Sequence, residues 1–293
     1  MKKLLITGAG GFIGRSITEN FESFYEVHPL NRTELDLNDS KSVLKKLKKN
    51  QYDIIIHCAN YDSAPKNSLR NSSLVIEKNL SMFFNITRCS DYYGKLIYFG
   101  SGAEFCRKHW VPNMSETYFD EHVPKDPYGL SKYIMTKYTL KSKNITNLRL
   151  FGVFGQFDDW RYRFISNVCC HVVLDDSIRI NQNALFDFLF IDDLLKIIKW
   201  FVDNESNLKV VNACTSKTLT FLEIAKKIIK ISKKKIKIKI QKEGLRTEYS
   251  GNNSLLLSKM NNFKFTSINS SLSDMYYWYE KNKGKIDPKQ FHY

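Results

Sequence analysis

The sequence predicts an α/β protein built on a doubly wound parallel sheet, and three observations carry this prediction. A short apolar run at residues 4–6 is followed by the spaced glycines Gly8, Gly11 and Gly14, and then by a helical pattern. Further apolar runs of strand length alternate with helical patterns, which is typical of a parallel sheet covered by helices. Glycine and polar residues follow these runs, at the strand ends where such sheets bind ligands.

Length and composition support a large folded core. The 293 residues suit one large domain, or a large domain with a smaller lobe, and 43% of them are hydrophobic. The longest apolar runs are too short or too charged to span a bilayer, and glycines follow Met1-Lys2-Lys3 instead of the long apolar stretch of a signal peptide. We therefore expect a cytoplasmic protein that does not insert into a membrane.

The cysteines do not form a recognisable site. All six are scattered, at positions 58, 89, 106, 169, 170 and 214. No spacing among them matches a zinc site or a CxxC pair. We expect free buried thiols and no metal.

The net charge of +15 suggests nucleic acid or an anionic membrane as possible partners. The lysines are nevertheless dispersed, and the densest stretch, residues 226–242, ends in alternating isoleucine and lysine. This alternation has the period of an edge strand with one buried and one solvated face. Binding of nucleic acid is therefore not expected, whereas the positive charge suits a small ligand that carries phosphate.

The glycine turn predicts a phosphate-binding site. A strand that turns tightly into a helix presents backbone N–H groups and the positive end of the helix dipole to an anion. Gly8 allows the turn, Gly11 lets a diphosphate approach the backbone, and Gly14 lets helix and strand pack closely. Phe12 and Ile13 open the helix. A glycine-rich loop without a ligand is the alternative, because such motifs also occur by chance.

The second predicted strand, residues 26–30, ends in Asn31 and Arg32. A dinucleotide-binding unit normally places a carboxylate there for the adenosine ribose, whereas an arginine accommodates a 2′-phosphate. NADP(H) is therefore favoured, with NAD(H) as the alternative and a solvated surface role for Arg32 still open. A helix at residues 41–49 follows, with Ser40 as its expected N-cap.

The third predicted strand, residues 52–59, is apolar nearly throughout, as in a buried parallel strand. We interpret His57 within it as a core histidine rather than a catalyst. A helix at residues 72–92 and a strand at residues 95–99 come next, and that strand runs into Ser101.

Several candidate residues stand at the carboxyl ends of these strands. They are the glycine turn, Arg32, the pair Cys58 and Ala59, and Ser101. Because the carboxyl ends of parallel strands meet at one edge of a sheet, the pattern predicts a single site.

Tyr128 and Lys132 form a candidate acid–base pair. They open a predicted helix over residues 128–142, and their spacing of four places them on the same helix face. An ammonium beside a phenol favours the phenolate and lowers the tyrosine pKa, which suits proton transfer near neutral pH. By itself the YxxxK spacing is common by chance.

Taken together, these motifs are similar to those of a known family. The matching pieces, in family order, are Thr7 to Gly14, Asp36-Leu37, His57-Cys-Ala59, Gly100-Ser101, Tyr128 to Lys132, Arg149 to Gly155 and Phe186 to Asp193. The chain resembles the extended short-chain dehydrogenases/reductases, in the branch that modifies nucleotide-activated sugars.

This resemblance implies roles for individual residues. Ser101 and Tyr128 would bind the reacting sugar oxygen, Lys132 would hold the nicotinamide ribose, and Asp36 and Leu37 would flank the adenine. The expected cofactor-binding residues are Gly8, Gly11, Phe12, Ile13, Gly14, Asn31, Arg32, Asp36, Leu37, Cys58, Ala59, Tyr128 and Lys132.

The resemblance also implies an organisation. Residues 1–160 would form the Rossmann-type dinucleotide-binding domain, joined by later segments around residues 185–215. Residues 161–293 would form mainly a smaller α/β substrate-binding lobe. A homodimer would assemble through the helices at residues 72–92 and 128–142.

Three departures from the family narrow the reaction. The Asp-Glu pair of the sugar-nucleotide dehydratases is replaced by Gly102 and Ala103, which argues against a dehydratase, and Glu104 stands one residue too far along. Gly152 and Phe186 replace an asparagine and an arginine that usually touch the sugar nucleotide. The expected substrate-binding residues are Ser101, Gly102, Ala103, Phe151, Arg161, Arg163 and Arg246, the arginines because guanidinium binds phosphate well.

The sequence therefore predicts an NAD(P)H-dependent reductase. It would reduce the C4 keto group of a dTDP-, GDP- or CDP-linked 4-keto-6-deoxy sugar for surface-glycan biosynthesis. The first alternative is a nucleotide-sugar 4-epimerase that holds NAD tightly. A non-catalytic dinucleotide-binding protein and a nucleic-acid-binding protein are the others.

Overall fold

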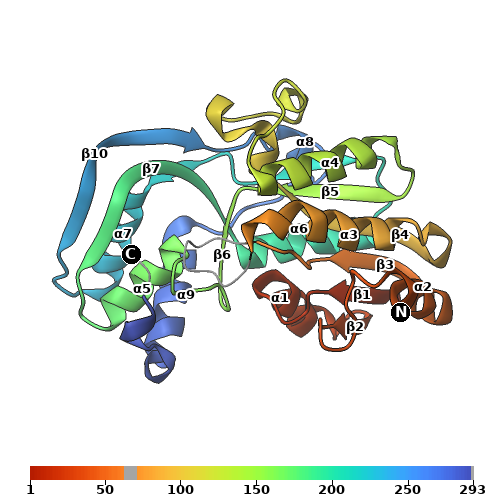
Figure 1. The fold of residues 1–293 in the computed structure, drawn as a ribbon. Coiled ribbons are helices and arrows are strands. Elements are labelled where there is room, and N and C mark those ends of the chain that lie inside the picture. Colours follow the sequence, from red (N-terminus) through yellow and green to blue (C-terminus); the bar gives the residue numbers. More distant parts are fainter. Residues whose placement is uncertain (63–70, 292–293) are drawn as a thin grey trace. The chain divides into compact units, whose positions relative to one another are not determined.

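A computed structural model describes residues 1–62 and 71–291 (Figure 1). The chain divides into two compact units. The first contains Met1–His109, Ser115–Leu150 and Ile197–Ala213, and the second contains Trp110–Met114, Phe151–Lys196 and Cys214–Tyr293. Neither unit is one continuous stretch of sequence.

The first unit is built on a parallel sheet of six strands in the order β2-β1-β3-β4-β5-β8. The strands are β1 (Lys3–Thr7), β2 (Glu26–Leu30), β3 (Tyr52–His57), β4 (Tyr93–Ser101), β5 (Ile145–Leu150) and β8 (Val210–Ala213). The sheet reverses its direction of winding after β1, since β2 lies on one side of it and β3 on the other. The predicted doubly wound fold is confirmed.

The register of this sheet places the carboxyl ends of neighbouring strands side by side. Thr7 at the end of β1 lies opposite Leu30 of β2 and His57 of β3. The residues that follow these three positions therefore leave the sheet side by side. Ser101 at the end of β4 lies opposite Leu150 at the end of β5.

Helices connect these strands. They are α1 (Phe12–Phe21), α2 (Ser40–Asn50), α3 (Val75–Thr87), α4 (Pro127–Lys141) and the last part of α6 (Ile191–Asp203). Helix α2 packs against α3, and α3 packs against α4. Asp39 caps α2 by accepting hydrogen bonds from the N–H groups of Lys41 and Ser42. The prediction that Ser40 is the N-cap is therefore wrong by one residue; both residue types favour that position.

The core of the first unit lies between the sheet and these helices. Leu5, Ile55 and Leu96 on three adjacent strands belong to one buried cluster with Phe83 of α3 and Met135 of α4. Burying each such side chain contributes on the order of 1.5–3 kcal/mol. This apolar layer holds the strand ends in fixed positions.

The second unit contains a smaller sheet in the order β10-β7-β6, which is parallel, with β9 antiparallel to β7. Its strands are β6 (Gly152–Phe154), β7 (Ile178–Phe190), β9 (Thr218–Thr220) and β10 (Ile238–Tyr249). Its helices are α5 (Phe164–Val173), the first part of α6, α7 (Phe221–Ser232), α8 (Ser254–Leu257) and α9 (Ile268–Lys281).

Strand β10 begins within the alternating isoleucine and lysine stretch and lies at the edge of the sheet, as expected. Within the alternating stretch Ile236 and Ile238 are partly buried and the lysines beside them are exposed, as expected, but Ile240 is 42% exposed. The strand beyond it is exposed up to residue 247. It pairs with β7 along one side, with shifts of register after Lys242 and after Arg246. Its lysines on the open edge discourage pairing with another chain.

Short 3₁₀ turns complete the chain: η1 (Ser72–Leu74), η2 (Ser90–Tyr92), η3 (Gly102–Phe105), η4 (Arg107–His109), η5 (Glu116–Tyr118), η6 (Lys283–Lys285) and η7 (Pro288–Gln290). The six cysteines are free thiols, and all but Cys58 are buried. Within residues 1–62 and 71–291, no helix combines the length and apolarity that crossing a membrane requires.

Candidate active site

The glycine turn joins β1 to α1 in the first unit. Gly8 adopts a φ of +66°, and a Cβ there would lie 2.7 Å from the backbone of Ala59. A Cβ on Gly14 would overlap the carbonyl of Gly8. Both positions therefore require glycine. Gly11 is the N-cap of α1 and supplies no side-chain cap, so no capping side chain of the described residues occupies the first N–H groups of the helix.

Beside this turn lies a pocket of about 480 Å³. Eight of the residues expected to bind the cofactor line it: Gly8, Gly11, Asn31, Arg32, Asp36, Leu37, Cys58 and Ala59. These eight residues come from the ends of β1 and β3 and from the stretch that follows β2, which the register of the sheet places side by side. Phe12, Ile13 and Gly14 belong to the first turn of α1 and are not among the lining residues in the described chain.

Sequence reasoning missed other lining residues: Gly10, Leu30, Leu35, Asn38, Asn60, Tyr61, Lys78 and Met82. Asn60 and Tyr61 extend the end of β3, so their place could have been inferred from the neighbouring Ala59. Lys78 and Met82 stand four apart on α3, a spacing that puts them on one helix face. Nothing in the sequence indicates which face of that helix meets the pocket.

Charges of both signs line the pocket. The carboxylate of Asp36 accepts hydrogen bonds from the backbone N–H of Asn38, at 3.0 Å, and from its side-chain amide, at 2.7 Å. These bonds, assisted by the charges of Arg32 and Lys78, lower the pKa of Asp36 below its ordinary value. Asp36 is therefore ionised at neutral pH, and two cations flank it in the same pocket.

The candidate catalytic residues also lie in the first unit. Ser101 ends β4, and Tyr128 and Lys132 lie in the first turns of α4. Asp126 caps that helix by accepting a hydrogen bond from the N–H of Gly129 at 2.8 Å, and Pro127 occupies its first position. The cap and the proline fix where the helix begins, and hence where Tyr128 lies.

Lys132 is the buried member of this group. Its side chain is only 5% exposed, and its ammonium donates a hydrogen bond to the carbonyl of Phe99 at 2.9 Å. The ammonium lies 5.7 Å from the centre of the Tyr128 ring. Burial lowers the pKa of Lys132 to about 8, although the charges of Glu104 and Asp62 oppose this shift. A cation is thus held close to the phenol.

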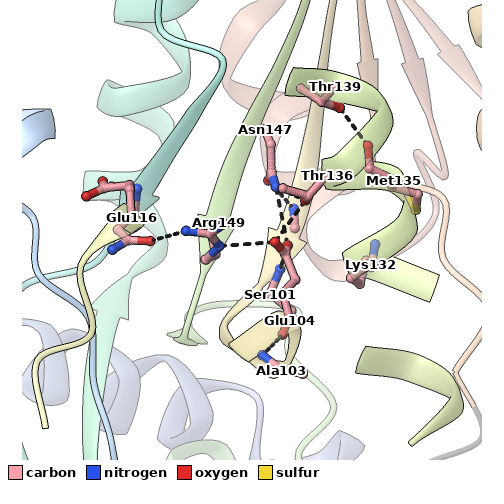
Figure 2. A network of polar contacts seen from close by, with 12 residues as sticks. Ser101, Ala103, Glu104, Glu116, Lys132, Met135, Thr136, Thr139, Asn147 and Arg149 are labelled. Atoms are coloured by element: carbon pink, nitrogen blue, oxygen red, sulfur yellow. Dashed lines mark hydrogen bonds and ion pairs between the residues drawn. The ribbon is translucent and has the colours of Figure 1, made fainter. Parts of the chain in front are cut away.

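Glu104 does not stand free for proton transfer. It is fully buried, and one carboxylate oxygen accepts hydrogen bonds from Thr136 at 2.8 Å and from Arg149 at 3.1 Å (Figure 2). The other oxygen accepts one from the backbone N–H of Ser101 at 2.9 Å. These contacts do not favour a catalytic role for Glu104, which is the buried partner of Arg149 and anchors the turn that carries Ser101.

Arg149 completes this network. It is fully buried, and its guanidinium donates to the side-chain oxygen of Asn212 at 3.1 Å. The ring centres of Phe105 and Phe119 lie 4.3 and 5.3 Å from the guanidinium carbon. Through Glu104, the backbone of Ser101 at the end of β4, Thr136 of α4 and Arg149 of β5 are held together.

His57 belongs to the core, as expected. It is 4% exposed, and its Nδ1 lies 2.8 Å from the hydroxyl of Thr7. Burial lowers the pKa of His57 to about 3. The imidazole is therefore neutral at physiological pH and joins β1 to β3.

The expected substrate-binding residues fall in both units. Gly102 and Ala103 are buried in the turn after β4. Phe151, Arg161, Arg163 and Arg246 belong to the second unit. Arg161 is paired with Asp159, Arg163 lies 3.9 Å from the buried carboxylate of Asp158, and Arg246 is exposed on β10. Their role toward a substrate stays a prediction.

The structure accounts for one of the departures from the family pattern. A Cβ on Gly152 would lie 2.7 Å from the carbonyl of Asp187 and 3.0 Å from the ring of Phe188. The contact between β6 and β7 therefore leaves no room for an asparagine at this position. Asp187 itself is buried and accepts hydrogen bonds from Thr215 and Ser216.

Comparison with known proteins places this geometry in a family. The model of the NAD dependent epimerase/dehydratase family matches residues 4–214. GDP-6-deoxy-D-talose 4-dehydrogenase of Aggregatibacter actinomycetemcomitans is 25% identical over 290 residues, which cover 94% of this chain and 97% of that protein. GDP-L-colitose synthase of Yersinia pseudotuberculosis is 24% identical, with 78% of this chain and 82% of that protein covered.

Solved structures share the fold. A GDP-L-fucose synthetase from Naegleria fowleri, bound to NADP, has a TM-score of 0.84 at 17% identity and covers 97% of this chain and 94% of its own. The UDP-glucose 4-epimerase of Thermotoga maritima has a TM-score of 0.81 at 20% identity and covers 95% and 99%. The family match extends over most of the chain, including the glycine turn and the Ser101, Tyr128 and Lys132 positions. The protein therefore belongs to the NAD dependent epimerase/dehydratase family, the extended short-chain dehydrogenases/reductases, and is an oxidoreductase-type enzyme with a nicotinamide dinucleotide cofactor.

Proposed function

We propose that the protein is an NADPH-dependent reductase of the C4 keto group of a nucleotide-activated 4-keto-6-deoxy sugar. The observation that carries this proposal is the buried ammonium of Lys132 beside the ring of Tyr128, on the helix that follows the strand ending in Ser101. This combination supplies a proton donor and a hydrogen-bond donor for an oxygen that becomes an alkoxide.

Hydride transfer is the chemistry that the reduced nicotinamide supplies when it is bound. In the proposed reaction, the C4 carbonyl carbon gains a hydride and its oxygen gains a proton, which yields a secondary alcohol and the oxidised cofactor. The hydroxyl of Tyr128 donates the proton, and the resulting phenolate is stabilised by the ammonium of Lys132. Ser101 donates a hydrogen bond to the developing alkoxide, since its hydroxyl carries a donor beside the lone pair that accepts from Ala103.

The surroundings of Ser101 support a reductase over a dehydratase. Loss of water from the sugar needs a second acid–base group near the reacting carbon. Gly102 and Ala103 carry none, and the carboxylate of Glu104 is engaged on both oxygens by Ser101, Thr136 and Arg149. A reduction at C4 needs only the tyrosine.

The charges of the pocket support NADPH as the cofactor. Arg32 follows the end of β2, and Lys78 from α3 lines the same pocket. In a dinucleotide-binding unit, a cation at the end of the second strand accommodates the 2′-phosphate of NADP. Asp36, held by Asn38, remains as an acceptor for the adenine amino group.

The names of the relatives support a GDP-linked substrate as the first one to test. Both GDP-6-deoxy-D-talose 4-dehydrogenase and GDP-L-colitose synthase carry GDP in their names. dTDP- and CDP-linked sugars are tested beside the GDP-linked ones. We place the reaction among those that prepare sugars for surface glycans.

A homodimer through α3 and α4 is part of the proposal. Tyr138 and Leu140 of α4 are 41% and 50% exposed, although Met135 on the same helix is buried in the core. Tyr138 also packs edge-on against Phe84 of α3, at 5.2 Å. Exposed apolar side chains on α4, next to the helix α3 that packs against it, suit burial against a second copy.

Oxidation of the cofactor tests the proposal. The purified enzyme is mixed with NADPH or NADH and with freshly prepared GDP-, dTDP- and CDP-linked 4-keto-6-deoxy sugars, and the loss of nicotinamide absorbance is followed. We expect oxidation with one nucleotide and a preference for NADPH. The alternative is a 4-epimerase, since epimerases share this fold. It predicts no net oxidation of NADPH or NADH, and NAD that stays bound through purification.

A further inference from the structure

Residues 230–242 of the second unit carry a dense group of cations that the proposed reaction does not use. This stretch contains seven lysines and neither aspartate nor glutamate. All of the lysines except Lys234 are exposed. The six exposed ones are here called the lysine edge: Lys230, Lys233, Lys235, Lys237, Lys239 and Lys242.

The end of α7 accounts for only part of this charge. Lys230 lies in the last turn of the helix, and Lys233 is its C-cap, with a left-handed φ of 58°. Cations at this position complement the negative end of the helix dipole. The lysines of residues 235–242 lie beyond the helix, so this local role does not explain them.

Strand β10 and the residues that lead into it present the other lysines. The carbonyl of Lys237 accepts a hydrogen bond from the N–H of Ile178 at 2.9 Å, so contact with β7 begins there. Lys239 stands two residues further on and therefore on the same face, opposite the exposed Arg179 of β7. Alternate residues of a strand are about 7 Å apart, which is less than the Debye length of about 8 Å at physiological ionic strength. Their charges therefore act together on an approaching surface.

Carboxylates of the same unit do not neutralise the lysine edge. Asp175 and Asp176 precede β7, but Asp175 pairs with Lys234 at 3.1 Å, and Asp176 lies 2.9 Å from Nδ1 of His171. Glu243 directly follows the stretch. Among residues 1–62 and 71–291, no carboxylate lies within ion-pair distance of a lysine of the edge. The lysine edge is thus not compensated by direct ion pairs.

The chemistry of the stretch indicates which anionic partner fits. Every cation of residues 226–242 is a lysine, and the stretch contains no aromatic residue. Sites for nucleic acids instead combine cations with aromatic rings that stack on bases, and use arginine for bidentate contacts.

Exposed aliphatic side chains accompany the lysines on β10. Ile240 is 42% exposed and Leu245 is 53% exposed. Because β10 is the last strand of its sheet, its open edge presents side chains from both faces to a flat surface (Figure 1). Lysines beside exposed aliphatic groups suit the boundary of an anionic lipid membrane, where ammonium groups stay among the headgroups and the aliphatic groups lie deeper.

We propose that the lysine edge is a docking surface for an anionic lipid membrane, on which the enzyme is held peripherally. The ammonium groups attract the negatively charged headgroups, and Ile240 and Leu245 enter the apolar boundary beneath them. Adsorption of this kind requires no membrane-spanning helix. The inference does not depend on the proposed reaction, because Ser101, Tyr128 and Lys132 take no part in it.

Cosedimentation of the full-length enzyme with lipid vesicles tests this inference. One set of vesicles contains phosphatidylglycerol and phosphatidylcholine in equal amounts, and the other contains phosphatidylcholine alone. We expect binding to the first set only. Raising NaCl from about 0.1 M to about 1 M shortens the Debye length from about 10 to about 3 Å, and should weaken the binding at least about tenfold.

The triple variant Lys235→Gln, Lys237→Gln and Lys239→Gln removes half of the lysine edge. Each lysine near an anionic surface strengthens binding by a factor of about five, so this variant should bind anionic vesicles about a hundredfold more weakly. The matched control removes the same charge from exposed lysines of α2, by Lys41→Gln, Lys45→Gln and Lys48→Gln. It should bind within about threefold of the unchanged enzyme, if local rather than net charge decides. Circular dichroism and Kd for the nicotinamide cofactor should be unchanged in both variants.

A further variant separates a membrane from a nucleic acid. Ile240→Thr combined with Leu245→Thr keeps every lysine and the preference for a strand, but removes apolar surface. It should weaken binding to anionic vesicles about fivefold. Binding of a single-stranded oligonucleotide, which offers no apolar layer, should be the same as for the unchanged enzyme.

Three results would overturn the docking surface. Equal binding to both sets of vesicles, or binding to neither, would exclude anionic lipid as the partner. An equal loss in the two triple variants would assign the effect to net charge rather than to the lysine edge. Tighter binding of the oligonucleotide than of anionic vesicles at the same salt concentration would make a nucleic acid the partner. Each of these results leaves the reductase proposal standing.

Discussion

Replacing Glu104 by glutamine should destabilise the enzyme strongly, because Glu104 and Arg149 form an ion pair in which both side chains are fully buried. Each carboxylate oxygen accepts hydrogen bonds: one from Ser101 and Asn147, the other from Thr136 and Arg149. An amide has one acceptor oxygen, so its NH₂ group would face donors on one side. The guanidinium of Arg149 would also lose its counter-charge.

Removing one partner of a buried ion pair costs about 3–5 kcal/mol. For a protein of this size, that loss corresponds to a Tm about 6–20 °C lower. Urea and thermal unfolding, followed by circular dichroism, measure both quantities. The matched control is Glu19→Gln, which breaks the exposed pair with Arg15 and should change the free energy of unfolding by about 1 kcal/mol or less.

A double variant separates the pair from other effects. Arg149→Met combined with Glu104→Gln removes both charges, so its loss of stability should be smaller than the sum of the two single losses, by about 1–3 kcal/mol. The structural role of Glu104 would be refuted if Glu104→Gln unfolds within about 1 kcal/mol of the unchanged enzyme yet loses a hundredfold or more in kcat. Glu104 would then take part in the chemical step.

Three further predictions concern pH, the cofactor and assembly. Because burial lowers the pKa of Lys132 to about 8, the lysine loses its charge as the pH rises through that value, and kcat for ketone reduction should fall about tenfold per unit above it. A flat profile between pH 7 and 10 would contradict this. Arg32→Ser should raise KM for NADPH about tenfold and leave KM for NADH unchanged, since one charged contact to the 2′-phosphate is lost; equal effects on both cofactors would point elsewhere. Leu140→Glu should convert the proposed dimer to a monomer in light scattering, with Leu44→Glu, another exposed leucine, as its control.

Much of the fold could be predicted from local patterns. The strand at residues 26–30 and the helix at residues 41–49 lie where the local sequence pattern puts them. Glycine, proline and capping residues mark their ends, and these signals act within a few positions of the chain. The strand ends bring the glycine turn, Arg32, Cys58 and Ala59 to one pocket, whereas Ser101 is not among its lining residues in the described part of the chain.

Contacts between residues far apart in the sequence could not be predicted from these local patterns. Glu104 and Arg149 are 45 positions apart and meet only because β4 and β5 are neighbours in the sheet. The same holds for Lys78, whose side of α3 is decided by packing against the sheet. The alternation of isoleucine and lysine at the start of β10 indicated a strand correctly. How far one face of that strand is buried depends on whether another layer covers it, which the pattern does not encode.

The most direct test of the central claim follows the hydrogen itself. The enzyme is supplied with NADPH deuterated at the transferable C4 position of the nicotinamide and with the 4-keto-6-deoxy sugar nucleotide that the panel identifies, and the product is examined by mass spectrometry and NMR. The account predicts one deuterium on C4 of the sugar, one NADPH consumed per product, and a loss of rate of at least about a hundredfold in Tyr128→Phe. A product inverted at C4 without deuterium and without consumption of NADPH would contradict it and identify an epimerase.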